Sequence, residues 1–193
     1  MAAFSELTED SGLGRQRRDN LQAALKLITR EEHGLGIEMN QRYISSAVCV
    51  DDDDVMPVFA SDPLENYHAT TYPGARVPHV WLSRSVPSKP MSTYDLAGKG
   101  RFALFTGIGG QGWKDAAKRA GEMLGLPIVA YQIGFRQEWE DRYLDWAKIR
   151  GVEESGCVLV RPDFFVAWRS QKWTESSEAD LMRALERVLS KGK

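Results

Sequence analysis

The chain of 193 residues lacks most features that mark a membrane, secreted or disulfide-rich protein. It has only two cysteines, Cys49 and Cys157, far apart in apolar segments. This pattern predicts two buried, reduced thiols, although it does not exclude a bridge between them. No apolar run approaches the roughly 20 residues of a membrane-spanning helix, and the first thirty residues hold no apolar stretch of signal-peptide type. We therefore expect a cytoplasmic protein without membrane contact.

An excess of one charge is missing as well. The net charge of −2 is spread over mixed signs, so we expect no nucleic-acid partner. The three histidines, His33, His68 and His79, show no spacing typical of a zinc site. The acidic run from Asp51 to Asp54 lacks the later Gly and Glu of a calcium loop and is predicted to be a solvated turn. We expect no metal site.

The first half of the chain contains few periodic elements. Residues 1–17 are polar and predict a loose start, and a helix is predicted from Asp19, ended by Gly34. The segment YISSAVCV, residues 43–50, predicts a strand. Residues 55–95 are rich in Pro and Ser and indicate a connector, with a domain boundary near its end.

The second half of the chain has a regular pattern of alternating elements. Strands are predicted at 101–107, 126–134, 157–162 and 164–170, and helices at 113–124, at 139–149 and from Ser177, which with Asp180 resembles a capping box. The short Pro162-Asp163 turn makes the last two strands antiparallel. The predicted fold class is α/β: a thioredoxin-like β-α-β-α-β-β-α domain without redox cysteines, preceded by a helix-strand extension.

A glycine-rich loop follows the first of these strands. In FTGIGGQGW, Gly107, Gly109 and Gly112 spell G-x-G-x-x-G, as in a dinucleotide-binding site. A Rossmann site also needs an acid at the end of the next strand, but that strand ends at Gly134 without one, and a hairpin follows. The loop also occupies the position of the redox Cys-x-x-Cys and holds no cysteine. We interpret it as a turn with positive φ angles, and a small Rossmann-like domain using Gly107–Gly112 remains the alternative.

Four segments resemble a known family. They are GIEMNQRYISSAV (36–48), DPLENYHATTYPGARVPHVWL (62–82), STYDLAGKGRFALFTGIGGQGW (92–113) and GCVLVRPDFFVAWRS (156–170). In order and spacing they resemble the C-terminal part of FAD-dependent aromatic-ring hydroxylases of the phenol and 2,4-dichlorophenol monooxygenase type. Those enzymes end in a thioredoxin-like domain without redox cysteines, in agreement with the element order above.

The resemblance implies a chain with no chemistry of its own. In the family, FAD and NAD(P)H are used by a long N-terminal region that is not part of this sequence. Residues 1–90 then correspond to the tail of a flavin/substrate-type region plus connector, and 91–193 to the thioredoxin-like domain. We expect no catalytic, cofactor-binding or metal residues in this chain and no cofactor for it alone. It should serve as a structural, dimerisation or docking module, and whether it acts within an enzyme stays open.

Two residues of PGARVPHVWL, Arg76 and His79, are the candidates for contacts to a flavin domain. The expected partners are such a flavin-binding domain or a second copy of the chain. A loop of polyproline type, shaped by Pro73 and Pro78, would explain the same residues without any contact.

Overall fold

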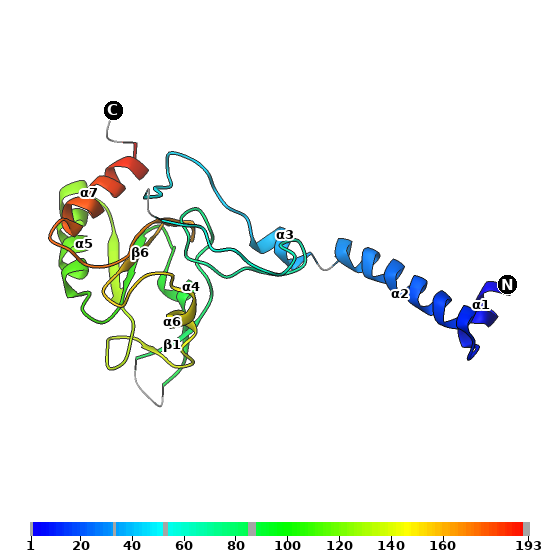
Figure 1. Ribbon diagram of the computed structural model, residues 1–193. Coiled ribbons are helices and arrows are strands. Elements are labelled where there is room, and N and C mark those ends of the chain that lie inside the picture. Colours follow the sequence, from blue (N-terminus) through cyan, green and yellow to red (C-terminus); the bar gives the residue numbers. More distant parts are fainter. Residues whose placement is uncertain (1, 33, 52–53, 85–87, 191–193) are drawn as a thin grey trace. The chain divides into compact units, whose positions relative to one another are not determined.

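The computed structural model describes residues 2–32, 34–51, 54–84 and 88–190. The chain divides into two compact units. One comprises Met1–Met39 and Phe59–His68, and the other comprises Asn40–Val58 and Ala69–Lys193 (Figure 1). The predicted division into residues 1–90 and 91–193 refers to regions of longer enzymes and stays a prediction.

The first unit is built on helices. They are α1 (Ala2–Ser5), η1 (Glu6–Thr8), α2 (Gly12–Glu32) and α3 (Leu35–Met39). The predicted loose start is wrong, because Ser11 Oγ accepts a bond from Gly14 N at 3.0 Å and so caps α2 before its first apolar residues. Near its other end, Arg30 binds Asp62 at 2.5 Å and Glu65 at 3.1 Å, which ties α2 to the second segment of its unit.

The helix α2 carries apolar side chains that remain exposed. Leu21, Leu25 and Ile28 lie at helical spacing and are 44%, 53% and 56% exposed. An amphipathic helix normally buries such a stripe against a partner. Within the described part of the chain, no helix combines the length and apolar character needed to cross a bilayer.

The second unit contains a four-stranded main sheet of β3 (Phe102–Thr106), β4 (Ile128–Gln132), β6 (Cys157–Val160) and β7 (Val166–Ser170). The strand order is β4-β3-β6-β7. The β3–β4 pair is parallel, and the other two pairs are antiparallel. With α5 (Gln111–Leu124) crossing from β3 to β4 and α7 (Ser177–Val188) following β7, this is the predicted thioredoxin-like order. The fold class and the hairpin are confirmed.

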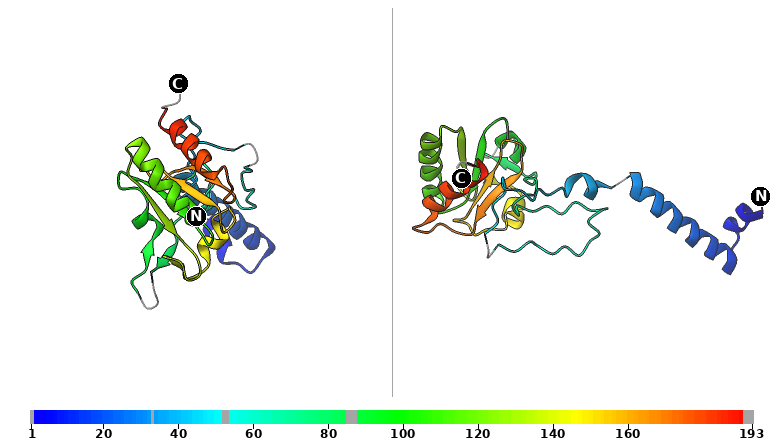
Figure 2. Two further views of the ribbon diagram at one scale, coloured as in Figure 1. Left: turned by 90° about the vertical axis from the view of Figure 1, so that its left-hand side faces the viewer. Right: turned by 90° about the horizontal axis from the view of Figure 1, so that it is seen from above.

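Side chains alternate along the strands and supply two cores. On one face, Leu104 and Leu159 pack with Trp113, Leu181 and other residues of α5 and α7, and Figure 2 shows these two helices side by side on that face. On the other face, Phe105 and Val158 pack against residues of the connector and of short elements that follow. The side chains of β3 and β6 are buried along their whole length, which is typical of a central strand with both faces covered.

The connector adds a second sheet that the sequence did not predict. It is formed by β1 (Trp81–Ser83), β2 (Met91–Ser92) and β5 (Glu140–Asp141), which pair antiparallel. The short helix α4 (Thr93–Leu96) follows β2 directly in the chain. The predicted helix over 139–149 is therefore shorter, and α6 covers only Asp145–Ile149. The reason lies in Asp141, whose carboxylate accepts bonds from the amides of Asp145 and Ala147 and so sets the start of α6.

The strand predicted for residues 43–50 is wrong. The chain turns there, since Ser45 O accepts from Val48 N at 3.1 Å and Ser45 Oγ accepts from Ala47 N at 3.3 Å. A serine that bonds neighbouring backbone groups offers an alternative to sheet pairing.

The capping box predicted at Ser177 is also wrong. The residue before α7 is Ser176, while the buried Ser177 Oγ accepts a bond from Thr174 N at 2.7 Å. The hydroxyl expected to cap the helix therefore stabilises the preceding turn.

Candidate functional site

The connector presents a row of polar and aromatic side chains on a fixed backbone. Val77 and Val80 are 0% and 2% exposed and belong to the second core. Arg76, His79 and Trp81 alternate with them and face solvent. The two buried valines fix the backbone of this segment, so the exposed side chains project from a rigid backbone.

Arg76 and His79 both lie near Tyr94, a residue that the sequence did not single out. His79 Nδ1 and Ser92 Oγ share a hydrogen bond of 2.7 Å, and the His79 ring stacks on Tyr94 with centroids 6.0 Å apart. Burial raises the pKa of the Tyr94 hydroxyl, and the positive charge of Arg76 partly opposes this shift. Trp81 completes the group with its ring centroid 4.7 Å from that of His79. We call Arg76, His79, Trp81 and Tyr94 the connector surface.

The position of Tyr94 follows from the capped start of α4. Ser92 Oγ accepts from Tyr94 N at 3.1 Å, and the Asp95 carboxylate accepts from Ser92 N at 2.9 Å, which is a complete capping box. The capping sequence S-T-Y-D is visible in the sequence. The contact of Tyr94 with His79, however, depends on the pairing of β1 with β2.

The connector surface carries side chains that are suited to binding. A guanidinium, an imidazole and two aromatic rings can bind an anionic or aromatic surface through hydrogen bonds and ring contacts. Over the described residues, no group of three or more His, Cys, Asp or Glu could hold a metal ion.

The glycine loop is packed tightly against its own domain. Gly109 has φ of 80° and supplies the predicted left-handed turn. Gly112 serves a different purpose, because a Cβ there would overlap the ring of Trp173. Trp113, next to it, is 0% exposed and donates from Nε1 to Ser155 O at 2.8 Å. At Gly112 the space that a side chain would need is therefore filled by the Trp173 ring of the same chain.

The sheet topology also contradicts the alternative of a small Rossmann-like domain. A dinucleotide site needs successive parallel strands on both sides of the switch point. Here the strand on the far side of β3 is β6, which runs antiparallel to it. The G-x-G-x-x-G match is thus a consequence of close packing in a thioredoxin-like βα turn.

Neither cysteine lies in the glycine loop, where a redox protein of this fold carries its pair, although Cys157 pairs with Thr106 at the end of the strand before the loop. Cys157 is 0% exposed and Cys49 is 3% exposed, and both are free. Burial raises the pKa of both thiols, that of Cys157 well above its ordinary value. Such thiols stay protonated at neutral pH and are poor nucleophiles.

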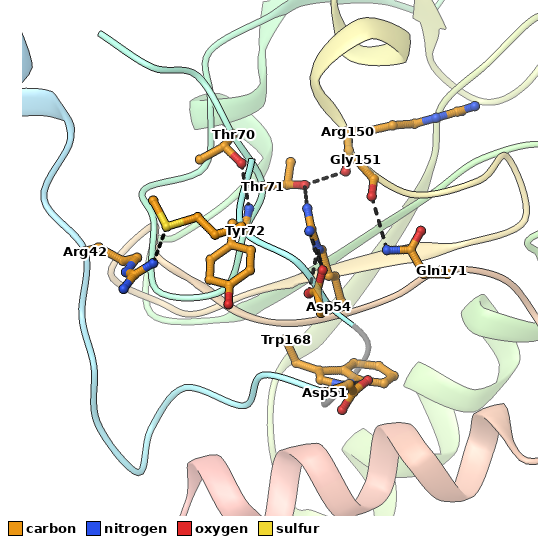
Figure 3. Close-up of polar contacts among 12 residues, drawn as sticks. Arg42, Asp51, Asp54, Thr70, Thr71, Tyr72, Arg150, Gly151, Trp168 and Gln171 are labelled. Atoms are coloured by element: carbon orange, nitrogen blue, oxygen red, sulfur yellow. Dashed lines mark hydrogen bonds and ion pairs between the residues drawn. The ribbon is translucent and has the colours of Figure 1, made fainter. Parts of the chain in front are cut away.

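Both described ends of the acidic run, Asp51 and Asp54, bind side chains of β7 (Figure 3). Asp54 N donates to Asp51 O at 2.9 Å, as in the predicted turn, but the Asp54 side chain is buried and not solvated. Asp54 forms an ion pair with Arg169, and the two side chains are 5% and 4% exposed. Arg169 Nε lies 2.9 Å and 2.8 Å from the two carboxylate oxygens, and Nη1 donates to Thr71 Oγ1 at 3.2 Å. Asp51 accepts from Trp168 Nε1 at 3.0 Å. Residues 52–53 of the run lie outside the described residues.

Comparison with known proteins gives a consistent assignment. Residues 70–192 match the profile of the family "Aromatic-ring hydroxylase, C-terminal". The chain is 46% identical to a 2,4-dichlorophenol 6-monooxygenase of Delftia acidovorans over 97% of its own length and 31% of that protein. A phenol 2-monooxygenase of Pseudomonas sp. (strain EST1001) is 41% identical over 92% of the chain and 29% of that enzyme.

A solved structure supports the same assignment. The flavin-dependent monooxygenase PieE, determined in complex with FAD and substrate, is 41% identical and superposes with a TM-score of 0.85 over 97% of this chain and 31% of PieE. The chain therefore spans about a third of the length of these relatives. From its sequence and its fold, the chain belongs to the aromatic-ring hydroxylase family and corresponds to the C-terminal part of those enzymes.

Proposed function

We propose that this chain is a non-catalytic assembly module that docks onto a flavin-binding region through the connector surface. The supporting observation is the rigid presentation of Arg76, His79 and Trp81 above a buried core. A surface with fixed side chains loses little conformational entropy on binding. The chemistry of hydroxylation would then belong to the partner region, as would FAD and NAD(P)H.

The exposed stripe of α2 supports the same proposal. Leu21, Leu25 and Ile28 present apolar side chains that an isolated chain leaves in water. Burial of such side chains is the usual driving force of association. If a flavin-binding region covers this stripe, the presence of exposed apolar residues on an otherwise polar helix is explained.

The test uses the flavin-binding region of phenol 2-monooxygenase, expressed without its C-terminal third. Titration calorimetry should detect a complex with this chain, and the double variant Arg76→Ala/His79→Ala should weaken it at least tenfold, equivalent to about 1.4 kcal/mol. Lys172→Ala, an exposed lysine outside the connector surface, is the matched control and should bind normally.

A second measurement addresses the cofactor. Added FAD should keep its absorption and fluorescence spectra unchanged in the presence of this chain alone, and should be retained when the flavin-binding region is added. Stoichiometric retention of FAD by the isolated chain would overturn the proposal.

A further inference from the structure

A pocket of about 320 Å³ lies at the carboxyl ends of the two parallel strands of the main sheet. Its wall includes Ile108, which comes shortly after β3, and Ile133 and Phe135, which follow β4. The other lining residues come from β5, from α6 and from the segments beside α6. Ligands of α/β sheets usually bind at the carboxyl ends of parallel strands, and small-molecule sites begin at about 300 Å³. The place and the volume of this pocket therefore suit a small molecule.

Apolar side chains form much of the pocket lining. Ile133 and Trp146 are 1% and 2% exposed and make up its inner part. Phe135 and Leu144 also line it, although they are 75% and 63% exposed. Large exposed apolar side chains that gather at one place often mark a binding site. The pocket thus offers apolar surface to a ligand both inside and at its mouth.

The guanidinium of Arg150 lies in the wall of the pocket without a close counter-charge. The Arg150 side chain is 16% exposed, and its one ion pair within the described residues is with Glu154, at 4.0 Å. Arg150 Nη1 lies 3.3 Å from the place that a Cβ of Gly107 would take, so the guanidinium is next to the glycine loop. A buried charge without a close partner is costly. An anionic ligand would supply that partner through paired N–H···O bonds.

The backbone holds Arg150 in this position. Arg150 N donates to Trp146 O at 2.8 Å at the end of α6. Arg150 O accepts a bond from the hydroxyl of Thr71, and the Arg150 side chain extends away from that contact (Figure 3). A side chain that starts from a fixed backbone loses less conformational entropy when it binds.

The carboxylates of the lining do not satisfy this guanidinium. The Asp141 carboxylate already accepts bonds from two amides at the start of α6. The Glu154 side chain is 62% exposed, so it can turn into solvent when a ligand takes its place. Glu140 and Arg142 bring opposite charges to the lining, which offset each other. Arg142 Nε is buried and makes no hydrogen bond to any described residue, so it is a second donor for a ligand.

We propose that this pocket binds a small hydrophobic carboxylate. The carboxylate pairs with the guanidinium of Arg150, and the apolar body of the ligand packs on Trp146, Phe135 and Leu144. An uncharged ligand of the same shape gains the apolar contacts but not the ion pair. The site is separate from the connector surface, and the inference does not depend on docking of a flavin-binding region.

The first test measures binding of two probes to the full chain by titration calorimetry. 2-Naphthoate should bind, and 2-naphthalenemethanol, which has the same rings without the charge, should bind at least about tenfold more weakly. Arg150→Leu should weaken binding of 2-naphthoate by a similar factor and leave that of the alcohol unchanged. The matched control is Arg119→Leu, which removes an exposed arginine of α5 and should change neither affinity.

A second variant keeps the proposal testable if Arg150→Leu fails to fold. Ala147 is an exposed residue of the lining, and Ala147→Trp should fill the pocket and abolish binding of both probes. Met123→Trp, an equal change at an exposed position of α5 outside the lining, should bind both probes normally. Circular dichroism verifies that each variant is folded. The proposal is overturned if 2-naphthoate does not bind at millimolar concentration, if folded Arg150→Leu binds it as well as the wild type does, or if Ala147→Trp still binds it.

Discussion

At the scale of single residues, the ion pair between Asp54 and Arg169 shows that burial determines how strongly the removal of one charge affects stability. An acidic run on a surface contributes little to stability, because exposed ion pairs are worth about 0–1 kcal/mol. Both partners here are at least 95% buried, since their side chains are 5% and 4% exposed. Removal of one partner would leave the other charge buried without compensation.

We expect Asp54→Ala to lower the free energy of unfolding by about 3 kcal/mol, because Arg169 would lose its counter-charge. Urea titration followed by tryptophan fluorescence measures this directly, with Trp168 next to the site. The matched control is Glu178→Ala, which removes the exposed partner of Arg119 and should shift the midpoint only slightly. Equal midpoints for the two variants would contradict the anchoring role of Asp54.

We expect both thiols to react slowly with a disulfide reagent in the native protein and fully in denaturant, because burial keeps them protonated. The raised pKa of the thiols also determines the direction in which stability changes at alkaline pH. Above the ordinary thiol value of 9.0, the unfolded chain releases protons that the folded chain retains, so stability falls as pH rises. A thiol that reacts at once at pH 7 would be inconsistent with this burial.

At the scale of elements, the turn between β3 and α5 has the glycine spacing of a phosphate-binding loop, but its glycines contact the chain itself. Glycines at a strand-to-helix turn can admit a phosphate or a neighbouring side chain. Gly112 admits the Trp173 ring, and the Trp113 indole lies 4.9 Å from that ring in an edge-to-face contact.

We expect Gly112→Ala to destabilise the domain by about 1–3 kcal/mol, because the added methyl group would displace Trp173 from its packing. Thermal or urea unfolding is the measurement. Gly12→Ala is the control, since nothing lies within 4 Å of a Cβ at that position. If Gly112→Ala unfolds at the wild-type midpoint, the close approach has been misassigned.

At the scale of the whole molecule, the two units differ sharply in burial. Residues of β3 and β6 are buried throughout. On α2, the described residues are exposed or half-buried apart from Gly14. Local stability follows this difference, because amides under few packed contacts open more readily.

Hydrogen exchange monitored by mass spectrometry should therefore show slow amides in β3 and β6 and fast amides in α2. Addition of the flavin-binding region should slow exchange in α2 if the exposed leucines become covered. Equal protection of α2 and β3 in the isolated chain would contradict this difference in stability.

The sequence was sufficient for the order of the second-half elements. The short continuous apolar run in FALFT is typical of a buried strand, and the apolar residues at helical spacing in 113–124 are typical of an amphipathic helix, so both are visible in the local pattern. The turn at Pro162-Asp163 likewise determined the antiparallel hairpin. The missing cysteines and the missing ribose acid made redox and dinucleotide readings of the glycine loop less favoured, whereas the sheet topology needed the structure.

Other features depended on contacts between segments distant in the chain. The Asp54–Arg169 pair joins residues 115 positions apart, and the connector surface depends on the β1–β2 pairing that brings His79 to Ser92 and Tyr94. The helix predicted over 139–149 is shorter because Glu140 and Asp141 pair with Ser83 and Leu82 of β1, far away in the chain. Local periodicity shows which side of an element is apolar, whereas only the tertiary structure decides which polar groups are buried and which groups they pair with, because their partners come from distant parts of the chain.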